Sequence, residues 1–333
     1  MKSKATHIPR IISIKKYTQE DKPQWDTFVQ EAKNATFLFQ RDFMEYHQDR
    51  FEDFSLLVYT NEKLVGLLPA NRKDAVVYSH QGLTYGGLVL NKKAKLEEVN
   101  TIFMELLEFL HSEGVSSLQL KLLPTIYQHL PSDELAYLLF IAEAKLIGTD
   151  VSSTVNMNAP VRIASNRMEG VKKGQKQNLH ISEDANFDAF WNEILVPNLK
   201  ERFQTTPVHS LDEIKNLASH FPKNILQFNV YDGDKIVAGA TIFETKEVAH
   251  VQYISANADK QKLGSLDFLF EHLLKTRFAN KNYFDFGTSN ENNGQQVNKG
   301  LQYWKECFGA RSIACTTYEV KTSNYSKLKE IFI

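Results

Sequence analysis

A lysine stands beside a tryptophan in the segment NKGLQYWKECFGA, near the C-terminal end of the chain. A helix over residues 300–308 would align Leu301, Trp304 and Phe308 in one apolar stripe, with Lys305 at its shoulder. The stem of Lys305 could then lie on Trp304 while the ammonium group reaches an adjoining cleft. A cation placed there stabilises an oxyanion or holds a phosphate or carboxylate. We therefore take Lys305 as a candidate catalytic residue; the alternative is a lysine whose ammonium lies in water.

The loop that precedes this helix, GTSNENNGQQVN, is rich in Ser, Asn, Gln and Gly. Such a loop offers many hydrogen-bonding groups and unusual backbone angles, and it joins the strand YFDFG to the helix. We expect Gly287 and Ser289 to contact a group donor, and Asn290 and Asn298 to contact an acceptor. A plain connecting loop is the alternative.

Two further candidates for proton transfer lie on the predicted strand AHVQYISA. Strict alternation would place His250 and Gln252 on one face and Tyr253 on the other. His250 could act as a base, and Tyr253 could donate a proton to a leaving group. A histidine on a strand is also commonly structural. Asp285, between two phenylalanines, suits a structural role as well as a catalytic one.

Composition places the chain among soluble globular proteins. Its 333 residues suffice for two domains, and 42% are hydrophobic and 24% charged. The net charge of −1 argues against electrostatic nucleic-acid binding by the molecule as a whole. The two cysteines form no CxxC pair, so we expect neither a disulfide framework nor a zinc or other metal site. With no signal peptide or membrane span expected, we predict a cytoplasmic protein.

An internal echo indicates two copies of one α+β unit. Residues 56–65 read LLVYTNEKLV and residues 228–237 read FNVYDGDKIV, each a strand, a polar turn and a second strand. A further strand, an amphipathic helix and a short strand follow in both copies. Because four elements recur in the same order, we predict two tandem domains, 1–155 and 156–333, each a mostly antiparallel sheet flanked by helices.

A basic stretch begins the second domain, within residues 165–184. It carries four cations against Glu169: Arg167, Lys172, Lys173 and Lys176. The functional interpretation is a surface for the phosphates of a nucleotide, coenzyme A or RNA. The alternative is a solvated charged face.

The second half resembles the FemAB-like branch of the GNAT acyltransferase superfamily. The resemblance rests on TPVHSLDEI, FPKNILQFNVYDGDKIVAGATIF, HVQYISA, YFDFGTSNEN and NKGLQYWKECFGA, and more weakly on FLFQRDFMEYHQDRF and HQGLTYGGLVL in the first half. It implies two GNAT-type domains and a reaction that moves an acyl or aminoacyl group to an amine. Members use aminoacyl-tRNA or acyl-CoA as donor, and in Fem-type enzymes the lysine at the position of Lys305 is implicated in the transfer.

The resemblance also implies a donor site at the start of the second domain's central helix. GNAT domains hold the coenzyme A pyrophosphate on a [QR]xxGx[GA] turn, and the matching segment here is QKLGSL. Gln261, Gly264 and Ser265 are the donor-binding candidates. Leu266 departs from the pattern, because a Gly or Ala is expected there, and this puts ordinary coenzyme A binding in doubt. The first copy has no such turn, so we expect it to bind no acyl donor.

The acceptor-binding candidates come from both halves. By resemblance, HQGLTYGGLVL in the first half helps to hold the acceptor, with Tyr85, Gly86 and Gly87. His209 lies in the motif PVHSL, beside the predicted N-cap Ser210. We expect a small-molecule or cell-envelope glycan-precursor acceptor, a possible tRNA partner, no bound cofactor, and a monomer or homodimer. The rivals are an acetyl-CoA-dependent N-acetyltransferase of a small metabolite and a non-catalytic module that kept the fold.

Overall fold

The computed structural model describes residues 11–333, without the side chains of residues 202 and 203, and the chain forms two compact units. Unit 1 comprises Met1–Gly148 and Thr316–Ile333, and unit 2 is Thr149–Cys315. The chain enters unit 2 inside strand β9 (Lys145–Asn156) and leaves it inside β17 (Arg311–Lys321). The sequence placed all residues after 155 in the second domain. The structure returns the C-terminal segment to unit 1, because β17 pairs there with β8 (Ser117–Lys121).

Unit 1 contains two groups of short strands. An antiparallel sheet has the order β1-β3-β4-β7, formed by β1 (Ile12–Lys16), β3 (Leu56–Thr60), β4 (Lys63–Leu68) and β7 (Val89–Leu90). A second group has the order β17-β8-β6-β5-β2 and adds β2 (Glu52–Asp53), β5 (Asn71–Lys73) and β6 (Val76–Tyr78). Within it β6 and β8 are parallel. The helices are α1 (Lys22–Glu31), α2 (Arg41–Met44), α3 (Leu96–Ser112) and α4 (Glu134–Ile141), with the short turns η1 (Gln19–Asp21), η2 (Phe37–Phe39), η3 (Glu45–His47), η4 (Thr125–Tyr127) and η7 (Thr322–Leu328).

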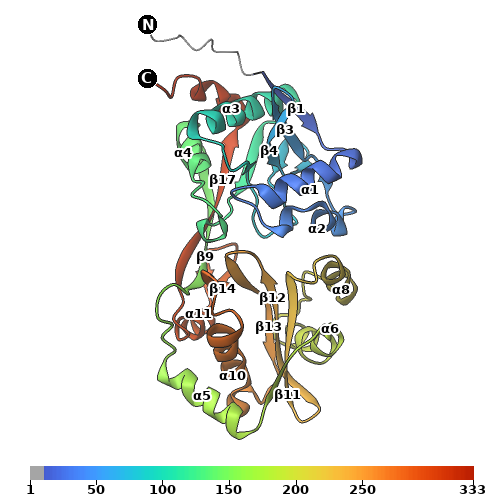
Figure 1. Cartoon of the computed structure of the whole chain (residues 1–333), viewed down its shortest axis with the longest axis vertical. Helices are drawn as coiled ribbons and strands as arrows, with labels where there is room; N and C mark the ends of the chain where they lie inside the picture. The colour runs from blue at the N-terminus through green and yellow to red at the C-terminus, as the bar shows by residue number, and fades with distance from the viewer. Residues whose placement is uncertain (1–10) are drawn as a thin grey trace. The chain divides into compact units, whose positions relative to one another are not determined.

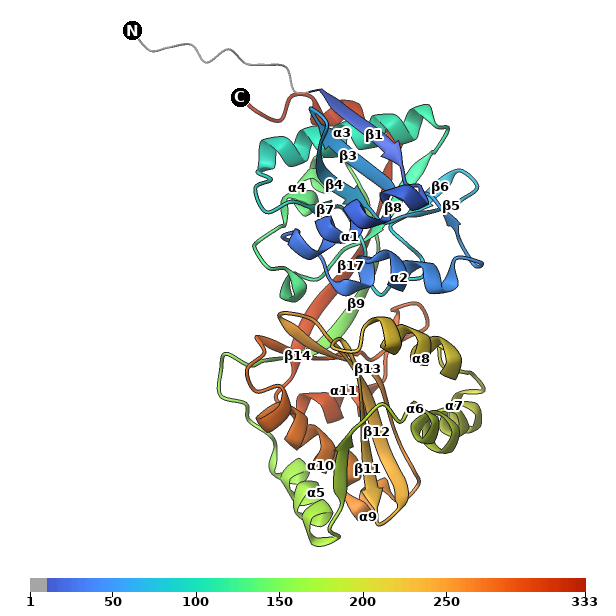
Figure 2. The same ribbon diagram turned by 45° about the vertical axis from the view of Figure 1, so that its right-hand side comes forward.

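Apolar side chains from α3 form the centre of the unit 1 core. Its buried face carries Ile102, Phe103 and Leu106, which pack with Leu56 and Val58 of β3. The residues recur at helical spacing, so the sequence alone accounts for this face. Figure 2 shows α3 and α1 beside the strands β3 and β4 that they cover.

Unit 2 is a sheet with helices on both sides. Its strands follow the order β10-β11-β12-β13-β14-β9, and they are β10 (His180–Glu183), β11 (Ile225–Asp232), β12 (Lys235–Glu244), β13 (Val248–Ala256) and β14 (Tyr283–Thr288), besides the hairpin β15 (Asn290–Glu291) and β16 (Gln296–Val297). The helices are α5 (Ser165–Lys176), α6 (Phe187–Ala189), η5 (Phe190–Leu195), α7 (Val196–Phe203), α8 (Leu211–His220), α9 (Lys260–Leu263), α10 (Ser265–His272), η6 (Leu273–Arg277) and α11 (Lys299–Glu306). Figure 1 shows α5 and α10 on one side of β11–β13 and α6 and α8 on the other.

The predicted α+β class and the repeated order of elements are both present. In each unit a hairpin (β3–β4 or β11–β12) is followed by a strand, a helix and a strand parallel to the preceding one (β6, α3 and β8; β13, α10 and β14). The pairs β1–β3, β10–β11, β12–β13, β14–β9 and β17–β8 are all antiparallel. The fold class expected from the sequence is therefore confirmed. The predicted capping box on α8, formed by Ser210 and Glu213, is also present.

Candidate functional site

Two parallel strands of unit 2 separate after a short pairing. β13 and β14 pair at Val248↔Tyr283, Ala249↔Phe284 and His250↔Asp285, and β13 then continues to Ala256 without that partner. Parallel strands that part in this way leave backbone and side chains available to a ligand at their carboxyl ends.

A bulge in β13 changes which side chains share a face. Across from β12, Tyr253 pairs with Thr241 and Val251 pairs with Ile242, so Gln252 is the extra residue. His250 lies opposite Phe243, two residues from Thr241, and thus on the same face as Tyr253. The prediction that Tyr253 faces away from His250 was therefore wrong, because strict alternation fails at a bulge.

Asp285 is the centre of a buried polar cluster at the point of separation. Its Oδ2 lies 3.0 Å from His250 Nδ1, and its Oδ1 accepts hydrogen bonds from the Ser152 and Thr154 hydroxyls and from the Gly287 N–H. With Asp285 ionised, the contact favours the proton of a neutral His250 ring on Nδ1 and the lone pair on Nε2. The arrangement suits a base whose ring is oriented by a carboxylate.

Lys305 lies beside this cluster but does not reach a cleft. Its side chain is 3% exposed, and its ammonium donates to the carbonyls of Gly287 at 2.9 Å and Thr288 at 2.7 Å. Burial lowers the pKa of Lys305 to about 8, although the nearby Asp285 opposes the shift. We expected the ammonium group to project into a cleft, and the structure differs. The carbonyls at the end of β14 accept its hydrogen bonds in place of water, so the group stays buried. Lys305 positions the end of β14 and the residues that Asp285 holds.

A pocket of about 470 Å³ lies at the carboxyl end of β13. Its wall combines apolar side chains with polar ones from β13, α5, η5, α7, α9, α10, α11 and the N-cap of α11: Arg167, Leu195, Asn198, Leu199, Ile254, Ser255, Ala256, Lys260, Gln261, Leu266, Asp267, Asn298, Gly300, Leu301 and Trp304. Its volume falls within the roughly 300–1,000 Å³ of small-molecule sites. Of the predicted donor-binding residues Gln261 lines it, and of the acceptor-binding residues Asn298 does.

The N-terminus of α10 is covered by α5. Gly264 has φ +67°, and a Cβ there would lie 2.0 Å from the Gly170 carbonyl oxygen, so α5 packs directly on this turn. Ser265 is fully buried. In the same turn the Asp267 carboxylate accepts from Arg167 at 3.1 Å and from the Trp304 indole at 3.2 Å. Burial raises the pKa of Asp267.

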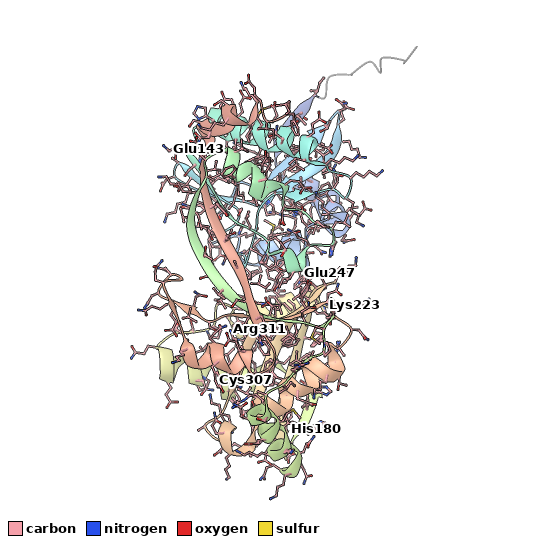
Figure 3. All side chains as sticks on the ribbon, turned by 90° about the vertical axis from the view of Figure 1, so that its left-hand side faces the viewer. Glu143, His180, Lys223, Glu247, Cys307 and Arg311 are labelled. Carbon is pink, nitrogen blue, oxygen red and sulfur yellow. The ribbon has the colours of Figure 1, made fainter. Side chains whose placement is uncertain are left out.

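The predicted loop residues bind one another and the neighbouring elements β9, β14 and α11. Gly287, at φ +72°, donates to Asp285 and accepts from Lys305, and the Ser289 carbonyl accepts from the Asn298 N–H at 2.8 Å. Asn290 accepts from the Val151 N–H at 2.8 Å. Asn298 caps α11 by accepting from the Leu301 N–H at 3.0 Å. Figure 3 shows the far end of that helix at Cys307 and the start of β17 at Arg311.

Tyr253 and His209 form a second, partly buried polar contact. The Tyr253 hydroxyl lies 2.6 Å from His209 Nδ1 and accepts from the His209 N–H at 3.1 Å. Burial raises the pKa of Tyr253 to about 12, so the phenol stays protonated at neutral pH. The pair joins β13 to the segment before α8, and neither residue lines the pocket described above.

The three acceptor candidates from the first half lie in unit 1 and belong to its packing. The Tyr85 hydroxyl donates to Thr36 Oγ1 at 3.0 Å. Gly86 donates its N–H to the Lys121 carbonyl at 2.6 Å, and a Cβ there would meet the Ser79 carbonyl oxygen at 1.6 Å. Gly87 has φ +103°. Close packing accounts for Gly86 and the positive φ accounts for Gly87, both without a ligand.

The sequence did not predict a role for Asp267 or its contact with Arg167. It also did not predict that Ser152 and Thr154 donate to Asp285. The contacts join residues about 100 to 133 positions apart, so no local pattern marks them. Among residues 11–333, no group of three or more His, Cys, Asp or Glu side chains could hold a metal ion.

Comparison with solved structures identifies the fold. The chain resembles the crystal structure of FemX with a TM-score of 0.68 and 11% identity over 96% of this chain and 100% of FemX. It also resembles L-PGS from Bacillus licheniformis, with a TM-score of 0.55 and 11% identity over 92% and 93% of the two chains. The expected likeness to the FemAB-like branch of the GNAT superfamily is thus confirmed at the level of fold.

No family model and no curated protein sequence matches the chain. No helix in the described part of the chain has both the length and the apolar composition needed to cross a membrane.

Proposed function

We propose that this protein is an acyltransferase that moves an acyl or aminoacyl group onto an amine of a small molecule or cell-envelope precursor. The observation that carries the proposal is the pocket of about 470 Å³ at the end of the bulged strand β13, in a chain that shares the fold of FemX. FemX and L-PGS are similar in fold at 11% identity, so the reaction itself rests on the site.

The chemistry requires an unprotonated amine and a held carbonyl. The amine nitrogen attacks the carbonyl carbon, the ammonium proton passes to a base, and the bond to the leaving oxygen or sulfur breaks as that atom takes up a proton. His250 is our candidate base, because Asp285 orients its ring from 3.0 Å. Neither residue belongs to the lining of the pocket, so the amine must approach His250 from beyond that lining. Lys305 is a positioning residue, since its ammonium holds the carbonyls of Gly287 and Thr288.

The geometry around the pocket favours a group donor that does not need to bind a pyrophosphate at the N-terminus of α10. The turn that would hold it is covered by the backbone of Gly170, and the Asp267 carboxylate lies in the first turn of the same helix. The ion pair with Arg167 favours the charged form of Asp267 against the effect of burial, and the charged carboxylate opposes a second anion there. Leu266 lines the pocket at the position where the sequence pattern expects a small residue. We therefore favour an aminoacyl ester, as in aminoacyl-tRNA, over an acyl-CoA.

A basic surface close to this pocket can serve an RNA donor. Lys172, Lys173 and Lys176 of α5 are exposed, and Lys173 Nζ donates to the carbonyl of Gln261, which lines the pocket. Phosphate contacts of this kind contribute affinity that falls with salt.

The first test measures binding of acetyl-CoA and of aminoacyl-tRNA by thermal shift and calorimetry. A ligand at about 100 times its dissociation constant stabilises the fold by roughly 2.7 kcal/mol. We expect aminoacyl-tRNA to bind and acetyl-CoA not to bind. Clear binding of acetyl-CoA would instead make the chain an acetyl-CoA-dependent N-acetyltransferase. Binding of neither donor, together with no transfer to any amine, would leave a non-catalytic module.

A charge-reversal variant separates specific RNA contacts from general attraction. Lys172→Glu/Lys173→Glu/Lys176→Glu should weaken tRNA binding and reduce the slope of log affinity against log salt by roughly 2. The control reverses exposed lysines elsewhere in unit 2, Lys223 and Lys235. Equal weakening by both variants would contradict a role for the α5 surface.

A further inference from the structure

Unit 1 contains a pocket of about 380 Å³ to which the proposed reaction assigns no role. Residues of α2, η3, the loop after it, β2 and the turn after β6 line it: Arg41, Met44, Glu45, His47, Gln48, Asp49, Phe51, Asp53 and His80. Its volume also lies in the range of small-molecule sites.

One wall of this pocket is held rigidly by Arg41. Arg41 is 2% exposed and donates to Glu45 Oε1 at 2.9 Å, to the Asp53 carboxylate and to Ser55 Oγ at 3.2 Å. The Tyr17 ring lies 3.7 Å from the guanidinium carbon, and its hydroxyl donates to Glu45 at 3.2 Å. Glu45 and Asp53 are therefore fixed before any ligand arrives, which reduces the entropy lost on binding.

The pocket carries excess negative charge. Three carboxylates, on Glu45, Asp49 and Asp53, line it with the guanidinium of Arg41 and the imidazole of His47, so the carboxylates outnumber the basic groups. Burial lowers the pKa of His80 to about 4, so this ring is neutral at pH 7. Such a field attracts a cation and disfavours phosphorylated or carboxylated ligands.

His80 adds a hydrogen-bond donor to the same wall. It is 8% exposed, has φ +134°, and accepts from the Gly82 N–H through Nδ1 at 3.2 Å. The neutral ring then carries its proton on Nε2, which has no hydrogen-bond partner within residues 11–333. A ligand with a hydrogen-bond acceptor would therefore satisfy His80, and Phe51 adds an apolar ring to the lining.

We propose that this unit 1 pocket binds a hydroxylated amine, a small cation whose ammonium group faces the carboxylates and whose hydroxyl oxygens accept from His80. Glucosamine, an amino sugar, is a representative molecule of this class. The proposal concerns unit 1 and stands independently of acyl transfer, so failure of either proposal leaves the other intact.

Ligand-observed NMR titrations of the full chain with four probes separate the contribution of the positive charge to binding affinity from that of the hydroxyl groups. Glucosamine carries both features, N-acetylglucosamine lacks the charge, cyclohexylamine lacks the hydroxyls, and glucosamine 6-phosphate adds an anion. At a pH where the amines are protonated we expect glucosamine to bind most tightly. Removing the charge or the hydroxyls should weaken binding about 2- to 5-fold, and the phosphate should abolish it. Equal binding of all four probes, or binding of none, would overturn the proposal.

Two charge-reversal variants, one inside the pocket and one outside it, test whether glucosamine binds in this pocket. Asp49 is exposed and makes no hydrogen bond or ion pair within the described residues, so Asp49→Lys should leave the fold intact. We expect at least 5-fold weaker glucosamine binding. Glu31→Lys alters an exposed carboxylate at the end of α1, outside the pocket lining, and should change nothing. Unfolding curves verify the fold of both variants. An Asp49→Lys protein that binds as wild type does would place the ligand elsewhere and refute the assignment.

Discussion

The two units contain the same pair of parallel strands, yet the space beyond the pair differs. Three residue pairs join β6 to β8 in unit 1, ending at Tyr78↔Gln119, and three join β13 to β14 in unit 2, ending at His250↔Asp285. In unit 1 Gly86 lies close to the end of the pair, contacting Ser79 and Lys121. In unit 2 β13 continues to a pocket of about 470 Å³.

The same strand topology can therefore end in a filled space in one unit and in a pocket in the other. In unit 1 the backbone around Gly86 fills the space at the end of the strand pair. The expectation that the first copy binds no acyl donor stays a prediction. Unit 2 places titratable groups there, with Asp285 as acceptor for several donors. The fold is shared, while the chemistry depends on the residues beyond the third pair.

The largest expected change in the free energy of unfolding comes from substituting the tightly packed Gly86. In Gly86→Ala the new Cβ would lie 1.6 Å from the Ser79 carbonyl oxygen, so the backbone of unit 1 must shift. We expect the free energy of unfolding to fall by about 3 kcal/mol or more, measured by urea unfolding. At Gly148 the nearest atom to a Cβ is 3.7 Å away, and Gly148→Ala should cost less than about 1 kcal/mol. Similar losses in both variants would mean that Gly86 does not fill the space tightly.

In the third residue pair, removing the Asp285 side chain of unit 2 should cost more stability than removing the Gln119 side chain of unit 1. Asp285→Ala leaves His250, Thr154 and the Gly287 N–H without their acceptor, and we expect a loss of about 3 kcal/mol. Gln119→Ala removes one hydrogen bond to Glu319 and should cost about 1 kcal/mol or less. Equal costs in denaturant unfolding would show that Asp285 has no special structural role.

The buried ammonium of Lys305 predicts an unusual pH dependence. Its pKa is about 8 in the folded protein, against 10.5 for an unperturbed lysine, so the unfolded chain binds more protons between these values. Stability from this group therefore rises as pH increases from about 8 to 10.5. Compared with Lys305→Met, the wild type should gain about 2–3 kcal/mol across that window. Urea unfolding at several pH values measures the difference; a constant difference would place the ammonium in water.

The smallest expected effect concerns two tyrosines, Tyr253 and Tyr85, that the sequence assigned to the site. Tyr253→Phe removes the hydroxyl from His209 Nδ1 and from the His209 N–H, and should cost about 1–2 kcal/mol. Tyr85→Phe removes one contact with the Thr36 hydroxyl and should cost about 1 kcal/mol or less. If Tyr253 instead donates a proton during transfer, Tyr253→Phe lowers kcat with little change in stability.

Local patterns predicted the elements well. Helical spacing marks the buried face of α3, paired hairpins mark β3–β4 and β11–β12, and Ser210 with Glu213 marks the start of α8. These signals lie within a few residues of one another, so propensity and periodicity suffice. The relation of Tyr253 to His250 could not be predicted in this way, because a single extra residue in β13 reverses the alternation.

The sequence by itself determined the α+β class and the repeated order of elements, whereas the apolar stripe expected beside Lys305 is incomplete, because Leu301 is exposed and Phe308 lies beyond the end of α11. Tertiary structure decided where the ammonium of Lys305 goes, which carboxylate orients His250, and that α5 covers the turn at Gly264. Each of these depends on residues brought together from separate elements, and a buried polar group takes whichever partner the packing supplies. The chemistry of the site therefore depends on contacts that no short stretch of the chain contains.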